Sequence, residues 1–301
     1  MNVMAWWRQL AVLIAFSASL SAVQAQGVSG STLDRIRENG AIYVGHRESS
    51  VPFSYMIGDD VVGYSKDLCD RIVGTIRDKL EMPSLKVVHV PVTSFSRILM
   101  LMTGTVDLEC GSTTNTKIRQ QRIAFSVTTF VSGVKTLVRK DTGIDRIADL
   151  AGKVVVTTSG TTTERLVKTA MSARKLSAPR TRTAAKHSDS FSMVLARQAD
   201  AFVLDDAILA GLLSTSPDAG RLKMLEENFG FEPYGIGMRR EDPEFKKLVD
   251  DTLVGMMKSG ELERLYNKWF MSPIPPDNVN LQLPMSEMLR DVLRNPNDNG
   301  I

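Results

Sequence analysis

The stretch 153-KVVVTTSGTTTERLVKTAMSARK-175 decides the fold class, because a strand, a polar turn and a helix follow one another within it. Residues 153–157 (KVVVT) are apolar and β-branched, which is typical of a buried strand. After the turn, residues 163–175 have the periodicity of a helix that begins at a Thr161-x-x-Glu164 capping box. A strand followed directly by a helix is the repeating unit of α/β proteins with a mostly parallel sheet.

The same alternation continues on both sides of this stretch. Towards the N-terminus, the sequence predicts a helix from a Ser31 cap to Gly40, strands at 41–45, 86–92 and 106–109, and helices at 65–80 and 94–102. Towards the C-terminus, it predicts helices at 189–198, 205–213, 243–258 and 261–270, and strands at 201–204 and 235–239. The five prolines after Met271 predict a tail that is not regular throughout. Because the alternation restarts near residue 134, we expect two α/β lobes.

Length and composition indicate a folded globular protein. The chain has 301 residues, of which 43% are hydrophobic and 24% charged, with a formal net charge of +3. The basic residues are scattered rather than gathered in a stripe, so we expect no nucleic acid partner. The two cysteines exclude a Cys-rich zinc module. The three histidines lie far apart, and no phosphate loop, dinucleotide loop or nucleophile elbow occurs, so we expect no metal and no cofactor.

The first 25 residues have the features of a secretory signal peptide. Arg8 precedes an apolar run at 10–16, and small residues lead to Val23 and Ala25 at the positions that signal peptidase reads. The alternative is a membrane anchor, but serines interrupt the run well short of the roughly 20 apolar residues that span a bilayer. We therefore expect cleavage near Ala25 and export to the periplasm.

Polar residues gather where four of the expected strands end. The groups are 45–50, 110–115 with Arg119 behind it, 157–164, and 205–206. Small ligands of open α/β sheets bind beyond the carboxyl ends of the strands, and the free N–H groups of a helix start favour an anion. Each group taken alone is better explained by helix caps and surface arginines, whereas four such groups at four strand ends favour a site as much as a surface. Two interpretations therefore stay open at this point, a small-anion site and an ordinary polar surface.

Five stretches carry a resemblance to a known family: GHRESSVPFSY (45–55), ECGSTTN (109–115), TSGTTTE (158–164), DDAILAG (205–211) and KWFMSPIPP (268–276). They resemble the polar amino-acid family of periplasmic solute-binding proteins, in particular its glutamate/aspartate-binding members, which are receptors of ABC importers. The resemblance covers nearly the whole chain after residue 25. It implies two α/β lobes joined by two hinge strands (the type II fold), and a monomer without enzyme activity. It also implies that L-glutamate or L-aspartate binds between the lobes and that a membrane permease is the partner.

The resemblance further implies a role for ten residues. By position, Arg119, Ser112 and Thr114 would hold the α-carboxylate of the ligand, and Thr162 and Thr163 would contact the ligand from a helix start of the second lobe. Asp205 would pair with the α-ammonium. The side-chain carboxylate would be surrounded by Arg47, Ser94, Arg97 and His187. Thr163 stands where a relative has Ser, and it keeps the hydroxyl. The match is loose over 173–183, but the SDSF sequence after His187 sets the register.

The chemistry of these residues fits an acidic amino acid. Such a ligand carries two carboxylates and one ammonium near neutral pH. Arginine offers a planar fork to a carboxylate, and aspartate offers acceptors to an ammonium. A neutral amino acid would leave part of the positive charge without a partner.

The alternation and the resemblance together predict the lobe boundaries. We expect the chain to cross between lobes near 130–135 and to return near 231–235. The first lobe is then 27–132 with 233–301, and the second is 133–232. Cys69 and Cys110 both fall in the first lobe, and in an oxidising compartment they form either a disulfide or a pair of buried thiols.

Two other functions compete with ligand capture. The first is a periplasmic enzyme on the same scaffold, similar to a dehydratase, which needs an acid or base at the reacting atom; Glu48 and Glu109 are the nearest candidates. The second is the sensor domain of a receptor kinase, which the lack of kinase motifs and of a later membrane-spanning segment disfavours.

Overall fold

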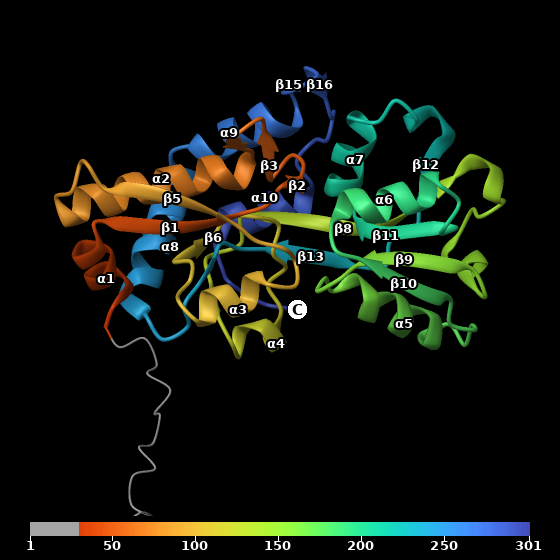
Figure 1. Ribbon diagram of the computed structural model, residues 1–301, viewed down its shortest axis with the longest axis horizontal. Coiled ribbons are helices and arrows are strands. Elements are labelled where there is room, and N and C mark those ends of the chain that lie inside the picture. Colours follow the sequence, from red (N-terminus) through yellow and green to blue (C-terminus); the bar gives the residue numbers. More distant parts are fainter. Residues whose placement is uncertain (1–29) are drawn as a thin grey trace, which may run out of the picture.

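The computed structural model describes residues 30–301 and shows two lobes side by side along the long axis of the molecule (Figure 1). The predicted signal peptide, residues 1–25, lies outside the described residues. Each lobe is a β-sheet with helices packed against it. Within residues 30–301, no helix has both the length and the apolar character needed to cross a membrane.

The sheet of the first lobe mixes parallel and antiparallel strands. Its order is β5 (Lys86–Pro91), β1 (Ala41–His46), β6 (Leu108–Glu109), β14 (Gly237–Met238) and β7 (Ala124–Phe125). β1 is parallel to β5 and β6, whereas β14 is antiparallel to both of its neighbours. β14 enters this sheet after the chain has returned from the second lobe, so the expectation of a mostly parallel sheet holds for only part of it.

Six helices surround this sheet: α1 (Thr32–Asn39), α2 (Tyr64–Leu80), α3 (Arg97–Met102), α4 (Lys117–Gln120), α8 (Pro243–Lys258) and α9 (Glu261–Phe270). A three-stranded meander follows β1 and consists of β2 (Ser49–Ser50), β3 (Ser54–Ile57) and β4 (Asp60–Val62). A disulfide joins Cys69 of α2 to Cys110, which directly follows β6, with the two Cα atoms 6.2 Å apart. The disulfide therefore ties α2 to the strand end that carries the ECGSTTN stretch.

The second lobe has the sheet order β10 (Arg180–Ala184), β9 (Val154–Thr158), β11 (Ala201–Asp205), β8 (Phe130–Arg139) and β12 (Leu222–Met224). β9 is parallel to β10 and β11, and β8 is antiparallel to β11 and β12. The helices are α5 (Thr163–Ala173), α6 (His187–Leu195) and α7 (Asp206–Ser214), and short 3₁₀ turns occupy Lys140–Thr142, Ile147–Leu150 and Ala219–Arg221.

Two paired strands connect the lobes. The first four residues of β8 pair antiparallel with β13 (Phe231–Tyr234), and the rest of β8 belongs to the second sheet. On the first-lobe side, Phe130 and Tyr234 join a cluster of rings with Phe53, Tyr64 and Phe270, in which Phe130 and Phe270 lie 5.0 Å apart between ring centroids. Such packing holds the connecting strands firmly on one side.

A carboxylate fixes β8 on the second-lobe side. Asp206, the first residue of α7, accepts hydrogen bonds from the Ser132 hydroxyl at 2.7 Å and the Gly133 N–H at 3.1 Å. β8 is thus anchored to both lobes within its paired segment, and β13 is attached to it there through strand pairing.

The C-terminal segment contains more structure than its prolines predict. It forms β15 (Pro273–Ile274), β16 (Val279–Asn280) and α10 (Glu287–Arg294). The helix forms because Ser286 caps it at the Leu289 N–H and Leu289 is buried, while Pro284 and Pro296 both lie outside it.

Three other local predictions need correction. α3 begins at Arg97 instead of residue 94, because Thr93 and Ser96 bond to each other's side chains and N–H groups and close a turn first. α6 begins at His187, two residues before the predicted start. The capping box at Thr161 does not form, because Thr162 is the N-cap of α5 without a side-chain capping bond and Glu164 pairs with Lys168 instead.

Candidate functional site

The polar groups that follow the strands meet where the two lobes face each other. The first lobe contributes residues that follow β1 and β6 or lie at α3 and α4: Arg47, Ser94, Arg97, Ser112, Thr114 and Arg119. The second lobe contributes residues at the end of β11 and at the starts of α5 and α6: Thr162, Thr163, His187 and Asp205. We call the region between these two sets the cleft.

Three arginines stand on the first-lobe side of the cleft. Arg47 and Arg97 are almost fully buried, and Arg97 Nη1 donates to the Ser112 carbonyl oxygen at 3.2 Å. Arg119 donates to the Thr114 carbonyl oxygen at 2.9 Å. Burial, followed by the charge of Arg97, lowers the pKa of Arg47 to about 9 and that of Arg119 to about 10. The cleft therefore concentrates positive charge that is poorly solvated.

His187 reaches this group from the second lobe. Its Nε2 lies 3.5 Å from Arg47 Nη2, and its Nδ1 lies 2.9 Å from the Thr158 hydroxyl. Since a guanidinium only donates, Nε2 is the acceptor and the proton sits on Nδ1. Burial, followed by the charges of Arg47 and Arg97, holds the pKa of His187 well below its usual value. His187 is therefore neutral and acts as a support for Arg47.

The remaining predicted residues of the helix starts have simpler surroundings. The Thr163 hydroxyl lies 2.7 Å from the Thr161 hydroxyl, and Thr163 is fully buried. Thr162 makes no capping bond with its side chain. The Ser94 hydroxyl is buried without a hydrogen-bond partner, and its carbonyl faces Gly160 of the second lobe.

Asp205 and one residue that sequence reasoning missed form the acidic part of the cleft. Asp205 is the last residue of β11, and Glu232 lies on β13; both are buried. The Thr114 hydroxyl, which was expected to help hold a carboxylate, donates to Glu232 Oε2 at 2.5 Å. Burial, followed by the charge of Glu232, raises the pKa of Asp205 well above its usual range. No sequence motif marks Glu232; only its place on a connecting strand brings it here.

Six side chains of the cleft have a buried polar atom that lacks a hydrogen-bond partner: Arg47, Ser94, Arg97, Glu109, Asp205 and Glu232. Leaving one such group unpaired costs about 1–3 kcal/mol, so proteins rarely gather them without a purpose. The set contains both donors and acceptors. A ligand that carries anionic and cationic groups together would satisfy them.

The lobes touch each other around the cleft. Arg119 Nη2 donates to the Gly160 carbonyl oxygen of the second lobe at 3.0 Å, and Lys186 Nζ lies 2.8 Å from Glu48 Oε2. A side chain added at Gly160 would collide with the Phe95 backbone, which shows how closely the lobes approach.

The two carboxylates considered for catalysis have other partners. Glu48 is half-exposed and pairs with Lys186, which lowers its pKa. Glu109 is fully buried at the end of β6, where its Oε2 accepts the Thr113 hydroxyl at 2.5 Å, and its negative charge favours the charged form of Arg47. Both positions suit a structural or electrostatic role better than an acid or base at a reacting atom.

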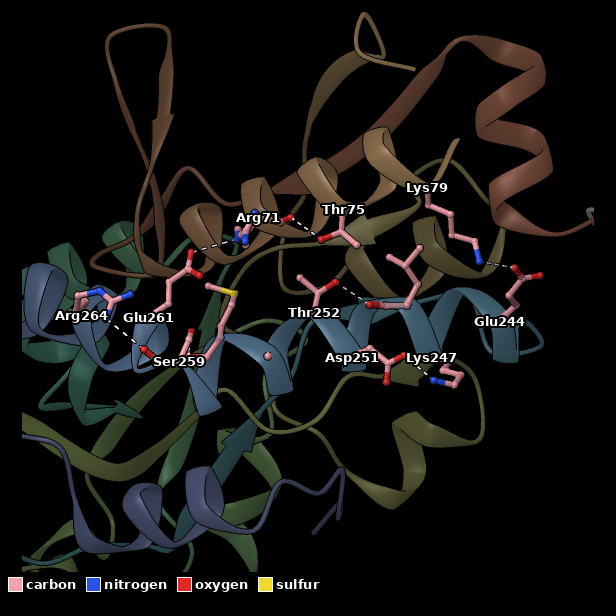
Figure 2. Close-up of a pocket in the computed structure, with 13 residues that line it drawn as sticks. Arg71, Thr75, Lys79, Glu244, Lys247, Asp251, Thr252, Ser259, Glu261 and Arg264 are labelled. Atoms are coloured by element: carbon pink, nitrogen blue, oxygen red, sulfur yellow. Dashed lines mark hydrogen bonds and ion pairs between the residues drawn. The ribbon is translucent and has the colours of Figure 1, made fainter. Parts of the chain in front are cut away.

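A separate groove of about 740 Å³ lies between α2, α8 and α9 (Figure 2). None of the ten predicted residues lines it. Its charged side chains pair with one another across the groove, Arg71 with Glu261 at 3.3 Å and Lys79 with Glu244 at 2.9 Å. The groove thus differs from the cleft, where buried polar atoms lack a hydrogen-bond partner.

Comparison with known proteins places the chain in a family. Residues 42–272 match the model of the bacterial extracellular solute-binding proteins, family 3. The chain is 43% identical over 290 residues to the glutamate/aspartate import solute-binding protein of Escherichia coli K12, covering 96% of both chains. It is 42% identical over 285 residues to the L-glutamate/L-aspartate-binding protein of Pseudomonas aeruginosa PAO1, covering 94% of both.

A solved structure extends the likeness to the fold. The substrate-binding protein of an ABC uptake transporter from Streptococcus pneumoniae, solved with bound histidine, superimposes with a TM-score of 0.71 at 19% identity, covering 81% of this chain and 97% of that one. At this identity the likeness concerns the fold alone, which is the two-lobed type II fold of periplasmic amino-acid-binding proteins. The family match and the two relatives go further: this chain belongs to the bacterial extracellular solute-binding proteins of family 3.

Proposed function

We propose that this protein is the periplasmic receptor of an ABC importer, which captures L-glutamate or L-aspartate between its lobes and delivers it to the membrane permease. The observation that carries the proposal is the cluster of partnerless buried donors and acceptors in the cleft. The names of the relatives from Escherichia coli and Pseudomonas aeruginosa support the same ligand pair. The proposal includes removal of the signal peptide near Ala25 and action as a monomer.

Each charged group of an acidic amino acid has a counterpart in the cleft. We assign the α-carboxylate to Arg119, with Ser112 and the α5 start (Thr162 and Thr163) around it. Thr114 lies beside this subsite and positions Arg119 through its carbonyl oxygen, because its hydroxyl is bonded to Glu232. The ammonium goes to Asp205, whose Oδ1 lacks a partner. We assign the side-chain carboxylate to Arg47, Ser94 and Arg97, with His187 supporting Arg47 from the second lobe. The partnerless Nε of Arg47 and of Arg97 supports that assignment, since a carboxylate accepts from such donors.

Capture requires the lobes to open and close about the connecting strands. We place the first lobe at 27–132 with 233–301 and the second lobe at 133–232, with the hinge in the paired segments of β8 and β13. Ligand contacts from both lobes would then favour the closed arrangement over the open one.

A calorimetric screen of the twenty amino acids against the purified mature protein tests the proposal. We expect tight binding of glutamate and aspartate, much weaker binding of glutamine and asparagine, and recovery of the bound ligand unchanged by chromatography. Equal affinity for glutamine would contradict the assignment of the arginines. Chemical conversion of any ligand would contradict the receptor function and favour the dehydratase-like enzyme.

A further inference from the structure

Glu232 stands out among the buried groups because no role for it follows from the sequence. It lies in the middle of β13 and pairs in register with Ser132 of β8, while Asp205 pairs with Val134 on the other side of the same strand. Residues directly opposite each other on antiparallel strands point to the same face, and so do residues two apart. Asp205, Ser132 and Glu232 therefore share the face of β8 that borders the cleft.

Two carboxyl groups are thus confined to one buried site. Glu232 is 1% exposed and Asp205 is 6% exposed, and neither forms an ion pair within the described chain. Each keeps one oxygen without a hydrogen-bond partner. The titratable and charged groups that face the pair from the surrounding elements are Tyr234 on β13, Asp206 on α7, Arg119 on α4 and, further off, Glu109, Arg97 and Arg47. Like charges so placed rarely both ionise.

Charge counting shows what an acidic ligand demands of this pair. The cleft holds three cations, Arg47, Arg97 and the half-buried Arg119, and three buried carboxyls, Glu109, Asp205 and Glu232. Asp206 is not counted, because its Oδ1 accepts from the Ser132 hydroxyl and from the N–H groups of Gly133 and Ala207, which already stabilise its charge. If all six are ionised, they cancel. A ligand with two carboxylates and one ammonium then adds a net negative charge to a desolvated site, which is costly.

We propose that Glu232 is the second carboxyl of the ammonium subsite, and that Asp205 and Glu232 together keep one proton while an acidic amino acid is bound. Once the pair holds that proton the cleft carries +1, and the −1 of the ligand makes it neutral. Where the pair is fully ionised in the free protein, it takes this proton up as the ligand binds. The inference deepens the proposed function and rests on it. When a neutral amino acid binds, the net charge of the cleft is zero only if the pair loses its proton.

The proton belongs to this pair and not to the other buried groups. Glu109 has partners of its own, because its Oε2 accepts the Thr113 hydroxyl and its charge acts on Arg47. The pKa of Asp205 is raised by burial and by Glu232, as a shared proton requires. His187 already receives its Nε2 hydrogen bond from Arg47, and the arginines disfavour a second proton on the ring.

Calorimetry in buffers of different ionisation enthalpy measures the proton directly. For wild type titrated with glutamate between pH 6 and 8.5, we expect uptake of up to one proton per ligand. Above the pKa of the pair in the free protein, affinity should fall by up to tenfold per pH unit, because the bound form then holds one more proton. Titration with glutamine should show no uptake.

Variants identify the group that holds the proton. Glu232→Gln keeps a hydrogen-bonding side chain without the charge, and Asp205→Asn does the same at the other carboxyl. Each should abolish proton uptake and flatten the pH dependence of glutamate binding. Glu226→Gln, a change at an exposed residue outside the cleft, is the matched control and should behave as wild type.

The outcomes separate this inference from the proposed function. Glutamate binding without proton uptake at any pH overturns the shared proton and leaves the receptor function standing. Uptake that persists in Glu232→Gln and Asp205→Asn but disappears in His187→Gln overturns the assignment to the carboxyl pair. Failure of wild type to bind any acidic amino acid overturns the proposed function, and this inference with it.

Discussion

Arg97 and Arg119 lie in one cleft but are expected to govern different properties of the ligand. Arg97 is directed by its bond to the Ser112 carbonyl, and Arg119 by its bonds to Thr114 and Gly160. Removing one partner of a desolvated charge pair costs about 2–5 kcal/mol, or roughly 30-fold to several-thousand-fold in affinity. We expect Arg97→Ala to weaken glutamate by this order while hardly changing weak glutamine binding. Arg119→Ala should weaken both, since both carry an α-carboxylate.

Titration calorimetry of the two variants with glutamate and glutamine makes the comparison. The two variants serve as controls for each other, because each substitution removes one guanidinium group from the cleft. If Arg97→Ala kept the glutamate affinity of wild type, the side-chain carboxylate would have to bind elsewhere.

His187 predicts a pH dependence of stability. Its pKa is depressed in the folded protein, whereas an unfolded histidine titrates near 6.5. The unfolded chain therefore binds more protons below pH 6.5, and the folded state loses stability as the pH falls towards the depressed value. Between pH 7.5 and 5.5, His187→Gln should lose about 1.4 kcal/mol less unfolding free energy than wild type. Urea unfolding at both pH values measures the difference, and equal losses would mean that His187 is not a buried neutral base.

At this scale, the sequence is informative about residues inside recognisable motifs and silent about others. Ser112, Asp205 and the hydroxyls of α5 stand in stretches that match a family, so their place near the cleft can be anticipated. Glu232 stands in no such stretch. The Thr114 hydroxyl that it accepts comes from a residue 118 positions earlier, and the two meet because Thr114 forms a β-bridge with Tyr234 of β13.

At the scale of elements, α7 offers a test of how the lobes meet. Gly211 lies within α7, and a Cβ atom there would overlap the Val51 carbonyl of the first lobe. Overpacking of this kind costs about 1–3 kcal/mol. We therefore expect Gly211→Ala to weaken glutamate binding roughly 5- to 150-fold, because the closed arrangement is the one that suffers.

The stability of Gly211→Ala should move in the other direction from its affinity. Alanine is about 1 kcal/mol better than glycine inside a helix, so the ligand-free protein should unfold at the same or a higher urea concentration. Gly74→Ala in α2 is the matched control, since nothing lies within 4 Å of its added Cβ. A Gly211→Ala protein that binds glutamate like wild type would show that α7 and Val51 do not close on each other.

The elements differ in whether the residues that make them form lie within the element or far away in the sequence. Long helices such as α2 and α8 are predictable because their apolar periodicity lies within the element, and α8 also has its Asp242 cap next to it. The short strands β7 and β12 are not predicted because each has two or three residues and exists through pairing with a distant partner, β14 and β8 respectively. The same reason explains the mixed sheets, since the antiparallel strands join them only after the chain has crossed between lobes.

At the scale of the whole molecule, the two paired strands predict a change of shape on binding. β8 and β13 connect the lobes, and the ring cluster around Phe130 and the bonds of Asp206 fix the strands to opposite lobes. Rotation is therefore concentrated in the short segment between these anchors. Outside the connecting strands, the lobes touch through polar contacts, such as Arg119 with Gly160 and the half-exposed pair of Lys186 with Glu48, and through the packing of α7 against Val51.

An exposed ion pair stabilises little, so closure should depend on the ligand. We expect the radius of gyration from solution scattering to decrease when glutamate is added to the ligand-free protein, because the ligand binds the closed form better than the open one. Glutamine at the same concentration should leave it unchanged, and Gly211→Ala should need more glutamate for the same decrease. An unchanged radius of gyration at saturating glutamate, in a protein shown by calorimetry to bind it, would mean that the lobes do not move and that the cleft admits its ligand in one fixed arrangement.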